Sequence, residues 1–148
     1  MRAAAISAPP KLFERAVMTI VLPPLAWSQF ELSSPPARRD WLALVNRMVN
    51  RGIEPNIGPV PGPTEPWRLW PVSGWCHDYA VTKRYELMLR GYSASELILC
   101  QCIADEGQHM VLLAGGLALD NLTDELHPMR YRIVRKQSAV NPDEWESA

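Results

Sequence analysis

Residues 73–91 read S-G-W-C-H-D-Y-A-V-T-K-R-Y-E-L-M-L-R-G, and the rest of the chain is organised around this stretch. A Ser-Gly turn precedes a run with helical periodicity, and Gly91 follows it as the residue after a helix C-terminus typically does. Apolar and long side chains fall on one stripe of this helix: Tyr79, Ala80, Lys83, Leu87 and the stem of Arg90. The stretch therefore predicts a helix that packs against the core and begins next to Cys76.

Cys76 lies in the first turn of this predicted helix. Free N–H groups and the positive end of the helix dipole meet in a first turn, and both favour a thiolate over a thiol. Cysteines in such places can have pKa values lowered to roughly 3.5–7.5. The alternative is an ordinary buried cysteine, because free cysteine is among the most buried residue types. Cys76 is thus a candidate nucleophile whose role depends on the rest of the chain.

The composition indicates one domain with reduced cysteines. The chain has 148 residues, which is enough for a proper core, and its formal net charge of −1 gives no indication of nucleic acid binding. Three cysteines cannot all pair, and Cys100 and Cys102 share one face of a strand, which does not suit a mutual disulfide. We therefore expect three free thiols.

The first 36 residues are predicted to form an extension or arm, followed by the domain proper at residues 37–148. Three Pro-Pro pairs exclude a long helix in residues 1–36. Residues 16–28 are apolar and are either part of an arm on the domain or the core of an export signal. The chain would be cytoplasmic in the first case and exported or periplasmic in the second. No stretch approaches the roughly 20 apolar residues of a transmembrane helix.

Between the arm and the cysteine helix, the pattern predicts a helix and then a loop. Residues 37–52 carry apolar side chains at helical spacing, with Asn46 and Asn50 flanking the apolar stripe. Residues 53–72 are rich in proline and glycine and predict an irregular loop, within which Trp67 and Trp70 are expected to pack over the following helix.

After Gly91 the chain predicts strands. Expected strands cover 95–104, 108–114 and 117–122, then a break at His127-Pro128, an outer strand over 129–138 and a loose tail from residue 141. Helices packed on an antiparallel sheet give an α+β fold class.

The turn Gly115-Gly116 predicts a two-residue hairpin, which fixes the register of its two strands. Ala114 should then face Leu117, and Val111 should face Asp120. Because side chains alternate along a strand, His109 and Asp120 lie on one face as diagonal neighbours, about 7–8 Å apart between backbones. The sequence therefore predicts that this imidazole and this carboxylate are within reach of each other.

A carboxylate in contact with an imidazole fixes its tautomer and stabilises its protonated form. Such a pair, aimed at the thiol of Cys76, would form a Cys–His–Asp nucleophile. Taken singly, His109 is more often a core histidine bonded to a carbonyl group, and Asp120 a carboxylate near a turn. Both, however, interrupt strands that are otherwise apolar, and burying polar groups is costly unless they are paired.

The ordered blocks G-W-C-H-D-Y-A-V-T-K-R, G-Y-S-A-S-E-L, G-Q-H-M-V-L-L and L-A-L-D-N-L resemble the bacterial transglutaminase-like cysteine peptidases, the LapG-like family, which has compact relatives in phages. The resemblance covers residues 41 to 145. It implies a papain-like, transglutaminase-like core with Cys76 as nucleophile, His109 as base and Asp120 as the group that orients it. Asp78 and Asn121 also match family positions, and Asn121 is assigned a supporting role.

The chain departs from the family pattern beside its cysteine. The family places acidic residues there, whereas this chain has Trp75 and His77. Relatives in this family are associated with calcium, a hard cation that prefers oxygen ligands, and neither residue offers one. The departure predicts that no cofactor is needed and that the family's calcium site is lost.

The leading interpretation is a thiol hydrolase that cleaves a peptide or amide bond in a protein or peptide substrate. The N–H groups at the helix start, at Trp75 and Cys76, are the expected oxyanion donors. Transfer to an amine, as in transglutamination, is not separated from hydrolysis by the residues. A catalytically degraded member that binds a peptide or partner is the alternative, because Trp75 could close the site. A metal site built from Cys76, His77, Cys100, Cys102 and His109 is a weaker alternative, because the spacing is poor for zinc.

Overall fold

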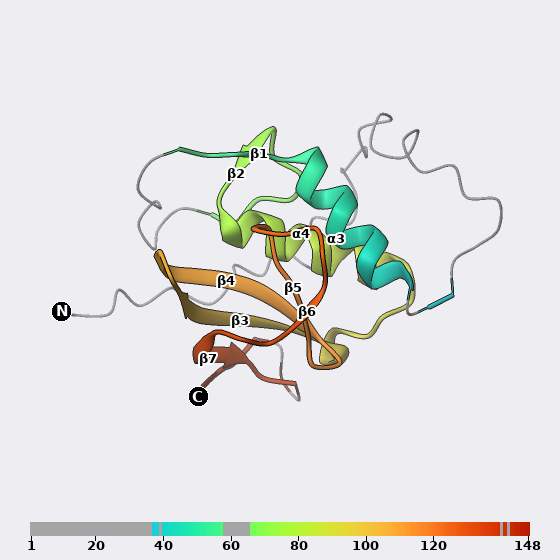
Figure 1. Ribbon diagram of the computed structural model, residues 1–148. Helices are drawn as coiled ribbons and strands as arrows, with labels where there is room; N and C mark the ends of the chain where they lie inside the picture. The colour runs from blue at the N-terminus through green and yellow to red at the C-terminus, as the bar shows by residue number, and fades with distance from the viewer. Residues whose placement is uncertain (1–36, 39, 58–65, 140, 142) are drawn as a thin grey trace.

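The computed structural model describes residues 37, 38, 40–57, 66–139, 141 and 143–148 (Figure 1). The predicted N-terminal arm at residues 1–36 lies outside these residues, and so does the middle of the Pro-rich loop, residues 58–65. Within the described part, the chain combines helices with a mainly antiparallel sheet, which confirms the α+β prediction.

Two helices lie side by side over the sheet (Figure 1). The cysteine helix α4 covers Cys76–Leu89, and the amphipathic helix α3 covers Asp40–Gly52, close to their predicted ranges. Gly91 follows α4 with a φ of +93°, a left-handed conformation that glycine adopts without strain. Because α4 lies between α3 and the strands β3 and β4, ten of its residues are buried, including polar ones such as Lys83 and Glu86.

The main sheet has six strands in the order β6-β5-β4-β3-β7-β8, all antiparallel to their neighbours. Its strands are β3 (Leu97–Ala104), β4 (Gly107–Ala114), β5 (Leu117–Leu119), β6 (His127–Pro128), β7 (Arg132–Gln137) and β8 (Trp145–Ser147). A short 3₁₀ helix, η2 (Ala94–Glu96), leads into β3. The predicted strand at 95–104 therefore begins two residues later than expected.

The hairpin β4–β5 has the predicted register. Ala114 pairs with Leu117, Leu113 with Ala118 and Leu112 with Leu119. Gly115 and Gly116 both have positive φ, +59° and +81°, as a type I′ turn requires. Continuing the same register, Asp120 follows β5 opposite Val111, which places its side chain on the parity of His109.

Three predictions about the sheet edges are wrong. His127-Pro128 does not break the sheet but forms β6, which pairs with β5. The strand at 132–137 is not outermost, because the polar tail that was expected to be loose forms β8 alongside it. β6 and β8 are two and three residues long and are held by backbone hydrogen bonds, so their side chains carry too little periodicity to reveal them.

The Pro-rich loop also contains regular structure at its two ends. β1 (Glu54–Pro55) pairs in parallel with β2 (Ser73–Gly74) immediately before α4. The N–H of Glu54 donates to Val72 O at 2.9 Å, and that of Asn56 donates to Gly74 O at 3.0 Å. This pairing ties the start of the cysteine helix to the chain that leaves α3.

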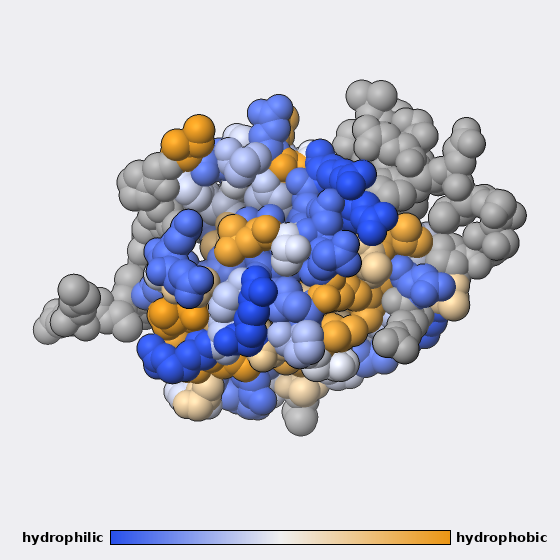
Figure 2. All heavy atoms as spheres, in the orientation of Figure 1, coloured by the Kyte–Doolittle hydropathy of each residue, from blue (hydrophilic) through white to orange (hydrophobic). Residues whose placement is uncertain are grey.

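The buried apolar side chains form two clusters. The larger one joins α3 and α4 to the sheet through residues such as Val45, Leu87, Leu99 and Leu112. The smaller one contains Cys100, Cys102, Val111 and Ala118. Figure 2 shows hydrophobic surface as separate patches between polar residues on the face drawn. None of the helices in the described part is long and apolar enough to cross a membrane.

Candidate active site

Cys76 is the first residue of α4, and the chain entering it is tightly fixed. Gly74 precedes it where a Cβ atom would lie 2.9 Å from Cβ of Asp78, so only glycine fits without displacement. The fully buried carboxylate of Asp78 accepts hydrogen bonds from the N–H of Trp75 at 3.0 Å and from the N–H of Arg68 at 2.8 Å. Asp78 is therefore a capping residue that holds the first turn, as expected for a carboxylate near a helix N-terminus.

The role predicted for Trp75 as an oxyanion donor does not agree with this geometry. Its N–H is already bonded to Asp78, and its carbonyl accepts the N–H groups of Asp78 at 2.9 Å and Tyr79 at 3.3 Å. The N–H of Cys76, in the first turn of α4, is the better candidate, since the first N–H groups of a helix have no partner within the helix.

Cys76 is partly exposed, and its thiol forms hydrogen bonds with the imidazoles of His109 and His77. Burial raises the pKa of Cys76, but hydrogen bonding with His109 and His77, together with their positive charge, outweighs burial and lowers the pKa from 9.0 to about 6. Burial raises the pKa of Cys100 to about 11 and that of Cys102 to about 12. Cys76 is thus the one thiol of the three, all of them described, that is set up to ionise near neutral pH.

His109 and Asp120 are in direct contact. Nε2 of His109 lies 2.8 Å from Oδ1 of Asp120, and both side chains are buried. Burial lowers the pKa of the imidazole, but its hydrogen bonds with Asp120 and Cys76 raise it from 6.5 to about 9. Burial raises the pKa of the Asp120 carboxyl, whereas the hydrogen bond with His109 holds it far below its usual range. These contacts therefore favour a thiolate at Cys76, an imidazolium at His109 and a carboxylate at Asp120, with the imidazolium interacting with both anions.

Sequence reasoning missed two further contacts of Asp120. The hydroxyl of Tyr131 donates to Oδ2 at 2.6 Å, and Nε2 of His127 lies 3.3 Å from the same oxygen. Both residues come from the segment around β6 and the start of β7. No local motif marks them, because they approach Asp120 only when β6 folds back along β5.

Helix α3 fixes the backbone of the Asp120 loop. Nδ2 of Asn50 donates to the carbonyl of Asp120 at 2.9 Å, and Nδ2 of Asn46 donates to Thr123 O at 3.1 Å and Asp124 O at 3.0 Å. The sequence indicated Asn46 and Asn50 only as polar neighbours of the core. Their position on one face of α3, four residues apart, was the available signal.

The tryptophans of the Pro-rich loop pack on α4, as predicted. Trp67 stacks on His77 with ring centroids 5.8 Å apart, and it meets Trp145 of β8 edge to face at 6.2 Å. Nε1 of Trp70 donates to Oε1 of Glu86 at 2.7 Å. The Trp67 contact fixes the ring of His77 beside the nucleophile.

The remaining predicted site residues contribute less. Asn121 directly follows Asp120, and its buried Oδ1 has no hydrogen-bond partner among the described residues. Cys100 lies in the smaller apolar cluster, whereas Cys76 packs against the larger one. Nowhere in the described part of the chain do three or more His, Cys, Asp or Glu side chains gather as a metal site would require.

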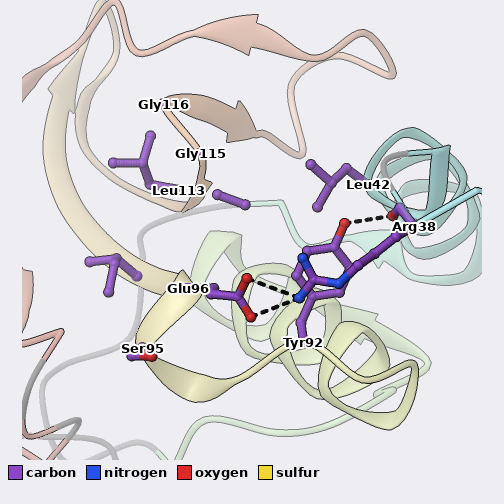
Figure 3. A pocket seen from close by; sticks show the side chains of 10 residues that line it. Arg38, Leu42, Tyr92, Ser95, Glu96, Leu113, Gly115 and Gly116 are labelled. Atoms are coloured by element: carbon purple, nitrogen blue, oxygen red, sulfur yellow. Dashed lines mark hydrogen bonds and ion pairs between the residues drawn. The ribbon is translucent and has the colours of Figure 1, made fainter.

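A pocket of about 650 Å³ lies elsewhere, at the Gly115-Gly116 end of the hairpin (Figure 3). Arg38 and Glu96 line it and pair with each other at 2.8 Å, while Arg38 also lies over the ring of Tyr92 at 4.1 Å. His109 is six residues along β4 from Gly115, which corresponds to roughly 20 Å. The charged groups of this pocket are already paired, and the pocket is separate from the candidate site.

Comparison with known proteins supports the relationship that the motifs indicate. The family model for bacterial transglutaminase-like cysteine proteinases matches residues 26–148. No curated protein matches the chain.

Solved structures of LapG from Legionella pneumophila have a similar fold. The calcium-bound form has a TM-score of 0.64 at 22% identity, with 78% of this chain and 71% of that chain covered. A further LapG structure from the same organism has a TM-score of 0.62 at 20% identity, with 78% of this chain and 71% of that chain covered. An EGTA-treated form gives 0.58 at 21% identity, covering 72% of this chain and 66% of that chain.

Proposed function

We propose that this chain, which belongs to the bacterial transglutaminase-like cysteine proteinases, is a peptidase that uses Cys76 as nucleophile, His109 as general base and acid, and Asp120 as the orienting carboxylate. The observation that carries the proposal is the 2.8 Å contact between Asp120 and His109, with His109 lowering the pKa of the partly exposed thiol of Cys76. The substrate is accordingly a protein or peptide.

The reaction follows from these groups. The thiolate of Cys76 attacks the carbonyl carbon, and the oxyanion that forms is stabilised by the N–H of Cys76. His109 then gives its proton to the leaving amine as the C–N bond breaks, which leaves a thioester on Cys76. His109 next takes a proton from water, whose oxygen attacks the thioester; the C–S bond breaks, which releases a carboxylic acid and restores the Cys76 thiolate beside the His109 imidazolium. Asp120 keeps the ring oriented throughout.

The proposal is tested with a mixture of peptides from a digested proteome. We expect new peptide ends to appear on incubation with the protein, and an electrophilic peptide analogue to add its mass to Cys76 and block cleavage. Labelling of Cys76 without any cleavage would contradict the proposal and favour the degraded, peptide-binding alternative. Products with an added amine in place of new ends would favour amine transfer.

The pH dependence follows from the shifted pKa values. A lowered thiol pKa means that alkylation of Cys76 by iodoacetamide should begin at lower pH, with a midpoint near 6 and not near 9. A raised imidazole pKa means that the proton donor persists up to about pH 9. Peptide cleavage should therefore be maximal between these values and fall on both sides. Mass spectrometry of the alkylated protein provides the measurement, with Cys100 and Cys102 as internal controls that stay unmodified at neutral pH.

Calcium does not fit the residues beside the nucleophile. Calcium takes six to eight oxygen ligands at about 2.3–2.6 Å. Trp75 offers no side-chain ligand, His77 offers nitrogen, and the two carboxylate oxygens of Asp78 already accept the N–H groups of Arg68 and Trp75. Binding calcium at Asp78 would displace the hydrogen bonds that cap α4. We therefore propose that the chain works without a calcium ion at this position.

Chelation is consequently expected to change neither the melting temperature nor the rate of peptide cleavage. The measurement is a thermal melt and a rate assay, each with and without excess EGTA. A loss in either that added calcium restores, and magnesium does not, would show that other oxygens supply a calcium site.

A further inference from the structure

Asp120 is held by more donors than a carboxylate that only orients one imidazole requires. Oδ1 accepts from Nε2 of His109 at 2.8 Å and from the N–H of Leu122 at 3.0 Å. Oδ2 accepts from the Tyr131 hydroxyl at 2.6 Å and lies 3.3 Å from Nε2 of His127. The carboxylate is fully buried, so these groups replace the water that would otherwise solvate it.

The rings of Tyr131 and His127, whose polar atoms contact Oδ2, are themselves held in place by packing. The ring of Tyr131 meets the ring of His109 edge to face at 5.7 Å and that of His127 in the same way at 5.8 Å. Nδ1 of His127 is in turn 2.9 Å from the carbonyl of Pro128, which fixes the His127 ring on its own strand. The three rings therefore form one packed unit around Asp120.

We propose that Tyr131 and His127 are positioning residues, which hold Oδ2 of Asp120 so that Oδ1 stays directed at His109. This inference rests on the proposed role of His109 and Asp120. It adds two residues whose polar groups act on Asp120 and not on the thiol or the scissile bond. The shorter contact makes Tyr131 the main group of the two. Other charged groups also act on this region. Lys83 interacts electrostatically with Asp120 and Asp124, and the guanidinium of Arg130 donates to the Tyr131 hydroxyl at 3.2 Å.

Tyr131→Phe tests this directly, because it keeps the ring contact with His109 and removes only the hydroxyl. We expect peptide cleavage to slow about tenfold through kcat with KM unchanged, as for the loss of one hydrogen bond to a charged group. The titration midpoint of His109, followed by NMR on histidine-labelled protein, should move below about 9, because a carboxylate free to rotate spends less time against the ring. The protein has three histidines, so each signal can be assigned by substitution.

Two comparisons separate positioning from a general structural effect. In an Asp120→Asn background, Tyr131→Phe should cause almost no further loss, since both changes act on one contact. Tyr92→Phe removes a tyrosine hydrogen bond of the same 2.6 Å length, to Arg38 O in the remote pocket, and should leave both the cleavage rate and the His109 midpoint unchanged.

For His127, the Ala variant should slow cleavage, and the Gln variant, whose amide nitrogen can occupy the place of Nε2, should restore it.

The outcomes are distinct. An unchanged or raised His109 midpoint in Tyr131→Phe, or an equal further loss in the Asp120→Asn background, would overturn the positioning role while the peptidase proposal stood. A lowered midpoint in a protein that cleaves no peptide would support the positioning role and contradict the proposed function. Thermal melts show whether each variant is folded. If Tyr131→Phe does not fold, the comparison of His127→Ala with His127→Gln decides whether the positioning role holds.

Discussion

Cys76→Ala is expected to reduce peptide cleavage to the uncatalysed rate while the protein stays folded. Among the described residues of the candidate site, Cys76 carries the one thiol with a lowered pKa, and its removal takes away the group proposed to form the covalent intermediate. Its removal leaves a methyl group in the first turn of α4, where the capping contacts of Asp78 do not involve the sulfur. Cleavage is measured on the peptide mixture and folding by a thermal melt.

The matched control is Cys100→Ala, which removes a fully buried thiol from the smaller apolar cluster. It is expected to lower the melting temperature more than Cys76→Ala does and to leave cleavage unchanged. Cleavage by Cys76→Ala at the wild-type rate would exclude the thiol mechanism. Loss of cleavage in both variants would mean that the assay reports folding and not catalysis.

Asp120→Asn is expected to keep the fold and lower kcat by a factor on the order of 10²–10⁴. An amide can present its nitrogen to His109, and the ring then loses both its charge partner and its preferred tautomer. The pKa of His109, which Asp120 helps to raise, should fall, so the alkaline limit of the pH profile should move to lower pH. The rate is measured across the pH range, with circular dichroism to verify the fold.

Glu125→Gln is the matched control, because it also converts a carboxylate to an amide in the loop that follows β5. Glu125 is exposed, and its backbone N–H donates to Oγ1 of Thr123 at 3.2 Å, while its carboxylate has no bond to another described residue. Asp124 is less suitable, since its carboxylate pairs with Arg51 at 3.2 Å and accepts from Asn50 at 3.3 Å. If Glu125→Gln slows cleavage as much as Asp120→Asn, the assigned role of Asp120 is incorrect.

The sequence predicted the elements whose signals are local. The helix from Cys76 to Leu89 follows from its periodicity and from Gly91, and the β4–β5 register follows from Gly115-Gly116. That register was sufficient to predict that His109 and Asp120 meet. Packing of Trp67 and Trp70 on α4 was predictable for a similar reason, because both lie within nine residues of Cys76, the first residue of that helix.

The short edge strands and the support around Asp120 were not predictable in this way. β6 and β8 have two and three residues, and their pairing depends on backbone groups that every sequence carries. Tyr131 and His127 reach Asp120 only after β6 has paired with β5. The engagement of the Trp75 N–H by Asp78 likewise depends on the tight turn at Gly74, which the residue types alone did not reveal.

The sequence alone thus determined which residues are candidates for the chemistry and which strand face carries His109 and Asp120, because helix period, hairpin turn and side-chain alternation act over a few neighbouring residues. Only the tertiary structure decided how Asp120 is oriented and what surrounds the thiol. Those features come from contacts between residues far apart in the chain, such as the 2.6 Å bond from Tyr131 to Asp120 and the 2.9 Å bond from Asn50 to its carbonyl. Their geometry is set by how the helices and strand edges pack, which no local pattern records.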